Sequence, residues 1–287
     1  MKDSMSPSRS PVSRDNLKEE RESPKRLNTP EGALKVFAIY FDEMRTHSFE
    51  PAGKTVLNIG AGDLIGLDVL FLLFGARRVV SVDLNPGRYL YPHLGDQRLF
   101  FEELASLIPS MGYGPLVRPW DDIIERRNGR PLYNRERLAR VTPCDAASLP
   151  LREGCVDFAF SNAVLEHVGD PEGVIREVAR TLSPGGHTMH RVDLRDHRDF
   201  SRPLEFLKSG ESNEGCNLWR ACRFERAFRG QLEVQDFVVF DSCRVTDAQR
   251  DSFGAPFRSL SCEELGKLRF MVYATKSGHT PERRKAP

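Results

Sequence analysis

The chain has 287 residues, with 42 basic and 41 acidic side chains and a formal net charge of +1. This length suits one large domain or two small ones with a substantial core. The balanced charge gives no electrostatic reason to expect nucleic acid or a membrane surface as a partner. The longest apolar run, near residues 67–76, is about half of what spans a bilayer. The first residues lack the apolar core of a signal peptide, so we expect a cytoplasmic protein.

The six cysteines also limit the class of site. They contain no Cys-x-x-Cys pair and have no histidine partners at zinc-finger spacing. Free thiols in a reducing compartment are the simplest interpretation. No metal site is expected from these spacings.

The first two segments of the chain differ sharply in composition. Residues 1–30 are rich in Ser, Pro, Arg, Lys and Glu and have few bulky apolar side chains, which predicts a disordered tail. The stretch EGALKVFAIYFDEM, residues 31–44, places apolar side chains on one helical face. We expect this helix to pack ahead of the first strand.

From residue 55 onward, strand-like and helix-like segments alternate, which indicates a parallel sheet covered on both faces. Two β-rich stretches follow near the end, with no obvious helix-length connection between them, and these favour an antiparallel closing pair. We expect a single domain over 31–280 and a short tail over 281–287. The expected strands are 55–60, 77–83, 139–146, 155–162, 186–194, 232–241 and 267–276, with helices over 63–76 and 170–182.

Residues 88–138 do not fit this alternation. They mix aromatic, charged and turn-forming residues and are too long for a plain loop. We interpret them as an inserted, partly helical subdomain. An insertion after the carboxyl end of a strand lies over the ligand crevice of an open α/β sheet, so it is a candidate lid or substrate pocket.

The stretch TVLNIGAG places Gly60 and Gly62 between the first strand and the first helix. Glycine there permits positive φ and lets a ligand approach the main chain. Asp83, at the end of the second strand, follows Gly62 by 21 residues and can accept from the hydroxyls of a ribose. The joint pattern predicts a nucleoside ligand. It leaves open a dinucleotide or S-adenosylmethionine, and a purely structural turn remains an alternative.

The second half of the chain separates these chemistries. Residues 141–187, VTPCDAASLPLREGCVDFAFSNAVLEHVGDPEGVIREVARTLSPGGH, closely resemble class I S-adenosylmethionine-dependent methyltransferases of the methyltransferase type 11 kind. The resemblance implies an α/β, doubly wound, Rossmann-like sheet of seven strands in the order 3-2-1-4-5-7-6, with the seventh strand antiparallel. The later stretch RVDLRDHRDFSRPLEFL resembles a bacterial subgroup linked to polysaccharide or small-molecule modification.

The resemblance also implies a role for particular residues in cofactor binding. The glycine loop would lie beside the methionine part, the acid after the second strand would hold the ribose and its neighbour would pack on adenine. The acid after the third strand would meet the exocyclic amine. Asn58 departs from the family, which often has an acid there. The implied cofactor contacts are Asn58, Gly60, Ala61, Gly62, Asp83, Leu84, Asp145, Ala146, Ser161 and Asn162.

The acceptor chemistry is expected after the fifth strand, where HRVDLRDHRD is dense in titratable groups. His190, Asp193 and His197 are the candidates for a general base and its orienting partner, because a carboxylate can fix the tautomer of a histidine. The arginines of the same stretch could pair with an anionic acceptor. A solvated charged loop is the alternative interpretation. The arginines are Arg191, Arg195 and Arg198.

Together these patterns predict methyl transfer from S-adenosylmethionine to oxygen or nitrogen of a small-molecule or saccharide acceptor. Nucleic-acid amine methylation is disfavoured, because the family's base methylators carry Asn/Asp-Pro-Pro-aromatic where this chain has SNAV. Two alternatives stay open. One is a non-catalytic cofactor-binding protein of the same fold, and the other is an NAD-dependent oxidoreductase or epimerase.

Overall fold

The computed structural model describes residues 30–62, 66–85, 106–108, 122–127, 130–210 and 215–278. The predicted tails over 1–30 and 281–287, apart from the first residue of the first helix, lie outside the described residues. So does most of the predicted insertion over 88–138. The division into tail, single domain and insertion therefore stays a prediction.

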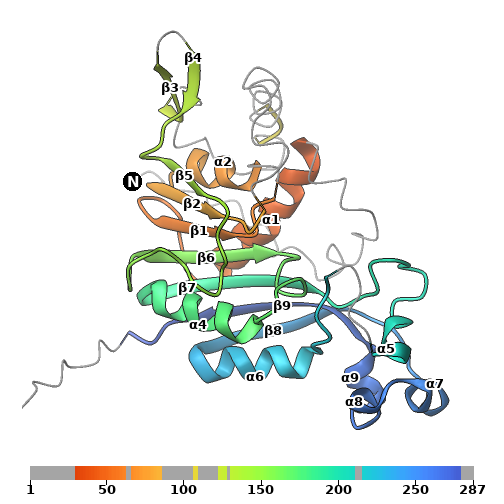
Figure 1. Cartoon of the computed structure of the whole chain (residues 1–287). Coiled ribbons are helices and arrows are strands. Elements are labelled where there is room, and N and C mark those ends of the chain that lie inside the picture. The colour runs from red at the N-terminus through yellow and green to blue at the C-terminus, as the bar shows by residue number, and fades with distance from the viewer. Residues whose placement is uncertain are drawn as a thin grey trace, which may run out of the picture.

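Seven strands form one sheet with the order β5-β2-β1-β6-β7-β9-β8 (Figure 1). The pairs from β5 to β7 are parallel, and β9 runs antiparallel to both of its neighbours. Numbered within this sheet, the order is 3-2-1-4-5-7-6, and the predicted fold class is confirmed. The strands are β1 (Thr55–Ile59), β2 (Arg78–Val82), β5 (Leu138–Val141), β6 (Val156–Asn162), β7 (Leu182–Asp193), β8 (Glu233–Ser242) and β9 (Lys267–Thr275).

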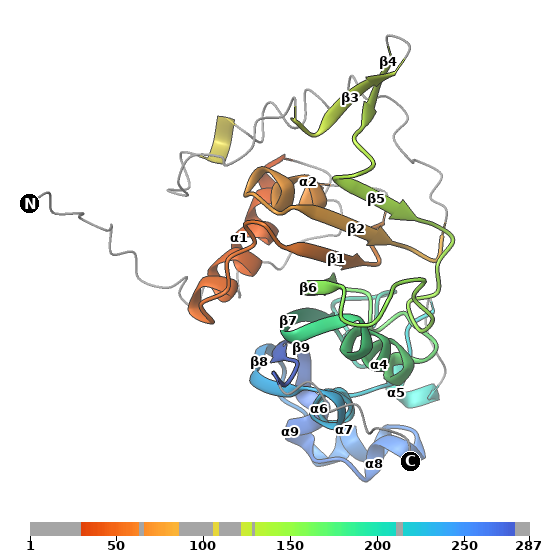
Figure 2. The ribbon, with the colours of Figure 1, turned by 90° about the vertical axis from the view of Figure 1, so that its left-hand side faces the viewer.

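Helices cover both faces of this sheet because its strands alternate their apolar side chains between two cores (Figure 2). On β6, Phe158 and Phe160 belong to the core of one face, whereas Ala159 belongs to the other. The first core is completed by α1 (Pro30–Thr46) and α2 (Gly66–Leu73) and the second by α4 (Pro171–Thr181) and α6 (Ala221–Gln231).

Two strand boundaries differ from the predicted ones by more than one residue. β5 ends at Val141 rather than continuing to residue 146, because the following Thr142–Pro143 lacks a main-chain donor for the ladder. β7 begins at Leu182, four residues earlier than predicted, and the turn-forming residues that follow it are extra residues of β7 in a register shift of its pairing with β6. Both differences lie at strand ends, where sequence patterns are weakest.

Short helices gather where β7 ends and β9 begins, at the edge toward which β6 points (Figure 1). They enclose a third small core that includes Phe206, Phe253 and Leu265. Only short helices join β8 to β9, in keeping with the absence of a helix-length connection. The sequence analysis did not anticipate them or α6. The short helices are α5 (Phe206–Ser209), α7 (Asp247–Ser252), α8 (Ala255–Arg258) and α9 (Cys262–Gly266).

Three further findings concern the described residues. An antiparallel hairpin of β3 (Ile124–Arg127) and β4 (Arg130–Tyr133) lies within the predicted insertion. Where the structure is described, no helix is both long and apolar enough to cross a membrane. All six cysteines are free thiols.

Candidate functional site

The loop of residues 60–62 bends sharply over the end of β2. Gly60 and Gly62 have φ values of +68° and +62°, which favour glycine. The N–H groups of Gly60 and Ala61 both donate to the carbonyl of Val82, at 2.9 and 3.2 Å. A Cβ on Gly60 would clash with the side chain of Val164, whereas one on Gly62 would meet nothing within 4 Å. The first glycine is thus required by packing, and the second borders open space.

Asp83 locks this loop to the end of β2. Its Oδ2 accepts from the N–H of Gly62 at 2.8 Å, and its Oδ1 accepts from the N–H of Asn85 at 2.8 Å. On the other side, the Arg140 guanidinium of β5 donates to the carbonyl of Gly62. Leu84, next to the carboxylate, is 65% exposed and presents an apolar surface to solvent.

The end of β5 brings a second carboxylate to the same edge of the sheet. The N–H of Cys144 donates to the carbonyl of Asp83 at 2.8 Å. Asp145 is exposed and accepts from the N–H of Ala147 at 2.9 Å, while Ala146 is half-buried. A bent glycine loop, two carboxylates and an exposed leucine at one edge fit the hydroxyls, amine and flat base of a nucleoside.

Asn58 is turned away from this edge into the core. Its amide donates to Oδ1 of Asp68 at 2.7 Å, and the Ser81 hydroxyl donates to Oδ2 of the same carboxylate. Asp68 is fully buried, and burial raises its pKa to about 6. Where the family often has an acid on the first strand, this chain has an amide that is bonded to a buried carboxylate of α2. Sequence analysis missed Asp68, although an acid within the run LDVLFLL was a usable signal.

His190 lies in the core rather than at the edge of the sheet. Its Nδ1 is 2.7 Å from the hydroxyl of Ser161, and its Nε2 is 2.8 Å from the hydroxyl of Thr188. The ring is completely buried, and burial lowers its pKa to about 3. This geometry argues against the predicted role of His190 as a base. It also argues against Ser161 as a cofactor contact, because that side chain is equally buried.

Asp193 forms a bidentate pair with Arg195. The guanidinium Nε and one terminal nitrogen of Arg195 donate to the two carboxylate oxygens, at 2.8 and 2.5 Å. The same guanidinium lies 4.5 Å from the ring centre of Phe200. The Asp193 carboxylate is therefore paired with an arginine and not with the ring of His190. A role for Asp193 in orienting a base stays a prediction.

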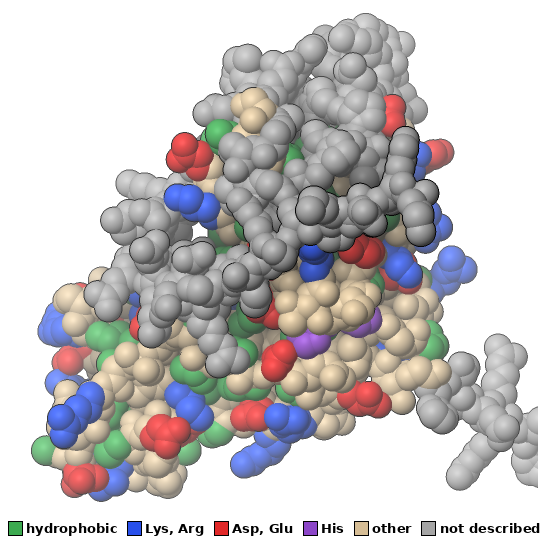
Figure 3. Space-filling model, turned by 180° about the vertical axis from the view of Figure 1, so that it is seen from behind, with side chains coloured by type: hydrophobic (Ala, Val, Ile, Leu, Met, Phe, Trp, Pro, Cys, Tyr) green, Lys and Arg blue, Asp and Glu red, His purple; other side chains and the backbone are tan. Residues whose placement is uncertain are grey.

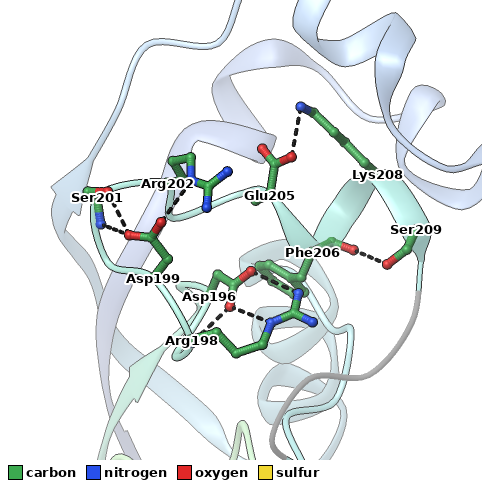
Figure 4. A network of polar contacts seen from close by, with 9 residues as sticks. All are labelled: Asp196, Arg198, Asp199, Ser201, Arg202, Glu205, Phe206, Lys208 and Ser209. Atoms are coloured by element: carbon green, nitrogen blue, oxygen red, sulfur yellow. Dashed lines mark hydrogen bonds and ion pairs between the residues drawn. The ribbon is translucent and has the colours of Figure 1, made fainter.

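The other two predicted anion-binding arginines also face partners within the protein. Arg191 donates to the side-chain oxygen of Asn162 at 3.2 Å, which places both predicted residues in one contact. Arg198 turns back onto the buried carboxylate of Asp196, at 3.2 Å (Figure 4). The Asp196 carboxylate offsets the positive charge of Arg198, whereas the neutral amide of Asn162 only orients Arg191.

Glu166, in the turn after β6, was not among the predicted site residues. One of its carboxyl oxygens accepts from the N–H of Asp193 at 3.2 Å, and the other is buried without a partner among the described residues. The side chain is 1% exposed, and burial raises its pKa well above the ordinary value. The segment LEHV was the signal for it. It places a carboxyl group between the carboxyl ends of β6 and β7.

His197, the third predicted catalytic residue, meets a different set of side chains from those expected. Its ring centre is 4.9 Å from that of His167, in the turn after β6. Its Nδ1 is 3.5 Å from the sulfur of Cys216. A catalytic role for His197 stays a prediction, and its neighbours are not His190 and Asp193.

Comparison with known proteins bears on the strands that form this site. Residues 124–189 match the family model described as a methyltransferase domain. That span includes β5, β6 and most of β7, but not the glycine loop. The strand order of the sheet independently agrees with the family. Over residues 124–189 the chain thus matches a methyltransferase domain, within a sheet that has the class I strand order.

This match agrees with the predicted family and enzyme class, and S-adenosylmethionine is the methyl donor that the class implies. Two curated relatives align with only part of this chain. The tRNA (carboxymethyluridine(34)-5-O)-methyltransferase ALKBH8 of Macaca fascicularis is 30% identical over 84 residues, and the Mus musculus protein gives the same values. The aligned region is 28% of this chain and 13% of each relative.

Solved structures resemble the methyltransferase domain at low identity. Geranyl diphosphate C-methyltransferase from Streptomyces coelicolor, solved with Mg²⁺, geranyl diphosphate and S-adenosyl-L-homocysteine, is 17% identical with a TM-score of 0.48. The likeness covers 93% of this chain and 86% of that one. A methyltransferase from Haloferax volcanii in complex with the Trm112 activator is also 17% identical with a TM-score of 0.48, over 93% of this chain and 98% of that one.

Proposed function

We propose that this protein transfers a methyl group from S-adenosylmethionine to oxygen or nitrogen of a small-molecule or sugar acceptor. The observation that carries the proposal is the hydrogen bond between the N–H of Gly62 and Asp83, with Leu84 and Asp145 at the same edge. This arrangement supports a nucleoside with a charged amino-acid arm better than a purely structural turn, since a closed turn needs no exposed leucine beside it.

In this proposal each residue at the edge contacts a different part of the cofactor. Asp83 accepts from the ribose hydroxyls, Leu84 packs on the base, and Asp145 accepts from the exocyclic amine. The cofactor supplies a methyl group on a sulfonium, which needs little activation. The protein then contributes mainly by positioning the acceptor, a term of about 7–11 kcal/mol in favourable cases.

Two features support a small acceptor. Acidic and basic side chains are interspersed over the face shown in Figure 3, with no one-sign patch among its described residues for a polyanion. A hollow of about 480 Å³ lies between the loop after β7 and α7, lined by residues that include Arg202, Glu205 and Gln249. This volume is in the range of small-molecule pockets.

The cofactor half of the proposal is tested by calorimetry with S-adenosylmethionine and S-adenosylhomocysteine. Asp83→Ala should weaken binding by about 1–3 kcal/mol, or about 5- to 150-fold, through loss of the ribose contact. Asp247→Ala, an exposed acid on α7, is the matched control and should bind as the intact protein does. Absence of binding to the intact protein, or binding of a nicotinamide cofactor instead, would overturn the proposal.

A second acceptor class is favoured by one observation. The curated relatives that match are tRNA methyltransferases acting on carboxymethyluridine, over 84 residues. Incubation with a labelled methyl donor distinguishes the classes when tRNA and a metabolite extract are offered separately. Label in metabolites supports the small-molecule proposal, whereas label confined to tRNA would replace it and would contradict the prediction of no nucleic-acid partner.

A further inference from the structure

Three side chains from distant parts of the sequence meet at the carboxyl edge of β6 and β7. His167 lies in the turn after β6, His197 in the loop after β7, and Cys216 just ahead of α6. Their ligand atoms all lie within 4.8 Å of one another. We propose that this His-Cys cluster binds a zinc ion. The inference depends on these residues alone and not on the proposed methyl transfer.

The distances within the His-Cys cluster agree with a shared ion. The sulfur of Cys216 is 3.4 Å from Nδ1 of His167 and 3.5 Å from Nδ1 of His197. Zinc bonds of about 2.3 Å to sulfur and about 2.0–2.1 Å to nitrogen, at a tetrahedral angle, place the two ligand atoms about 3.5–3.6 Å apart. Both contacts match that separation within about 0.2 Å.

Hydrogen bonding from the thiol explains only part of this arrangement. A thiol has one proton, so it can donate to one of the two imidazole nitrogens, and the other contact needs the ring to donate to sulfur. Cys216 is 3% exposed, and such a buried thiol forms only weak hydrogen bonds. An ion between the three atoms accounts for both contacts together, with the cysteine as thiolate and both Nδ1 atoms unprotonated.

The surrounding main chain holds the ligands in place. The side-chain amide of Asn217 donates to the carbonyls of Leu165 at 2.7 Å and Val168 at 3.1 Å, and its main-chain N–H donates to the carbonyl of Glu166 at 2.5 Å. These bonds fasten the residue next to Cys216 onto the turn that carries His167. Such support preorganises the ligands and so favours binding of the ion.

The loop that carries His197 is fastened in the same way. The main-chain N–H of Asp196 donates to the carbonyl of Pro203 at 2.8 Å, and its carboxylate accepts from the N–H of Arg198 at 2.9 Å. Figure 4 shows the contacts of Asp196 with Arg198 and those of Asp199 with Ser201 and Arg202. His197 is therefore held between two residues with fixed main-chain positions.

The donor set selects the metal. Two imidazole nitrogens and a thiolate suit zinc, whereas magnesium and calcium prefer oxygen ligands. Three protein ligands leave the fourth tetrahedral position open, as in catalytic rather than structural zinc sites. His167 is exposed, and Phe200, 43% exposed, has its ring centre 5.7 Å from that of His197. The open position therefore lies near solvent, where water or an acceptor oxygen can reach the ion.

A second cluster, Glu43, His47 and Asp236, is explained without an ion. His47 pairs directly with Asp236 at 3.0 Å, and its ring stacks on Tyr273 with centres 3.8 Å apart. It contributes two carboxylates and no sulfur. This cluster serves as an internal comparison, since its variants should leave the zinc site unchanged.

The experiment uses the full chain, stripped with a chelator under reducing conditions and then titrated with zinc or cobalt(II). We expect uptake of one ion per chain and, with cobalt, the intense visible bands of tetrahedral coordination with a sulfur-to-cobalt charge-transfer band. Cys216→Ser should abolish the charge-transfer band and weaken zinc binding at least about 10-fold. Cys155→Ser, a matched cysteine outside the cluster, and His47→Gln should retain both.

His167→Ala keeps the test decisive if Cys216→Ser fails to fold, because this side chain is exposed and its removal should leave the core intact. It should weaken zinc binding about 10-fold or more while preserving the unfolding transition of the apo protein. Failure of the intact chain to retain an ion after dialysis would overturn the inference. Equal zinc affinity in the intact chain and His167→Ala would also overturn it.

Discussion

The two halves of the sheet edge hold their polar groups in different ways. At the ends of β1, β2 and β5, main-chain N–H groups of the glycine loop bond to Val82 and Asp83, and Asp145 is exposed. At the ends of β6 and β7, Glu166 is buried and His190 is buried just behind the edge. The first half therefore holds its polar groups through a fixed backbone, whereas in the second half burial raises the pKa of Glu166 and lowers that of His190.

One polar contact of the first half is buried, the one between Asn58 and Asp68. Changing it should have the largest effect on the free energy of unfolding. Asn58→Asp would restore the family's usual acid but place a second carboxylate against Asp68. In the intact chain, the amide nitrogen of Asn58 lies 2.7 Å from Oδ1 of Asp68. We expect a loss of about 3–5 kcal/mol in the free energy of unfolding at neutral pH, because a buried charge would be left without compensation. Urea denaturation measures it.

The double variant Asn58→Asp with Asp68→Asn is the control, since it exchanges amide and carboxylate and should recover most of the loss. The stability that Asp68 contributes should decrease as the pH rises. Asp68 has a pKa of about 6 in the folded chain against 3.8 in its ordinary state, so its stabilising proton is fully present below pH 3.8 and lost as pH rises through 6. A single variant as stable as the intact chain at pH 8 would contradict the assignment.

Gly60 tests whether the glycine loop is fixed by packing as well as by φ. Gly60→Ala should cost about 2–4 kcal/mol of unfolding free energy, from a left-handed alanine and from the contact with Val164. Gly53→Ala has a similar φ of +74° and open space, so it should cost only about 1–2 kcal/mol. Denaturant midpoints compare the two. Equal losses would show that Val164 moves aside, and the loop would then be less constrained than the structure indicates.

Most strand positions, and the places of Gly60, Gly62 and Asp83 at strand ends, could be predicted from the sequence. Alternating apolar segments defined the strands, and Gly60, Gly62 and Asp83 lie at strand ends where the backbone leaves little choice. The strand order came from the resemblance to a family. The short helices α5 and α7–α9 could not be predicted in this way, because segments of 4–6 residues carry too little periodicity.

The second half could not be predicted, because its side chains acquire their roles from partners distant in the sequence. His190 pairs with Ser161, 29 residues away, and Cys216 meets His167, 49 residues away. A stretch dense in titratable residues showed which groups were present but not which of them would be buried. The apolar run around Asp68 was a usable signal for a buried acid, but its partners Asn58 and Ser81, on two different strands, could not be read from the sequence.

The smallest expected effect is on the pH dependence of stability, and it tests whether His190 is a buried core residue or a catalytic base. The ordinary pKa of His190 is 6.5 and the folded value is about 3, so between these values the unfolded chain binds a proton that the folded chain does not. Stability therefore falls as pH falls through 6.5 toward 3, by about 2 kcal/mol between pH 7 and pH 5. His190→Gln should remove that dependence. It should leave methyl transfer within a few-fold, whereas loss of a true base would lower kcat by about 10²–10⁴-fold.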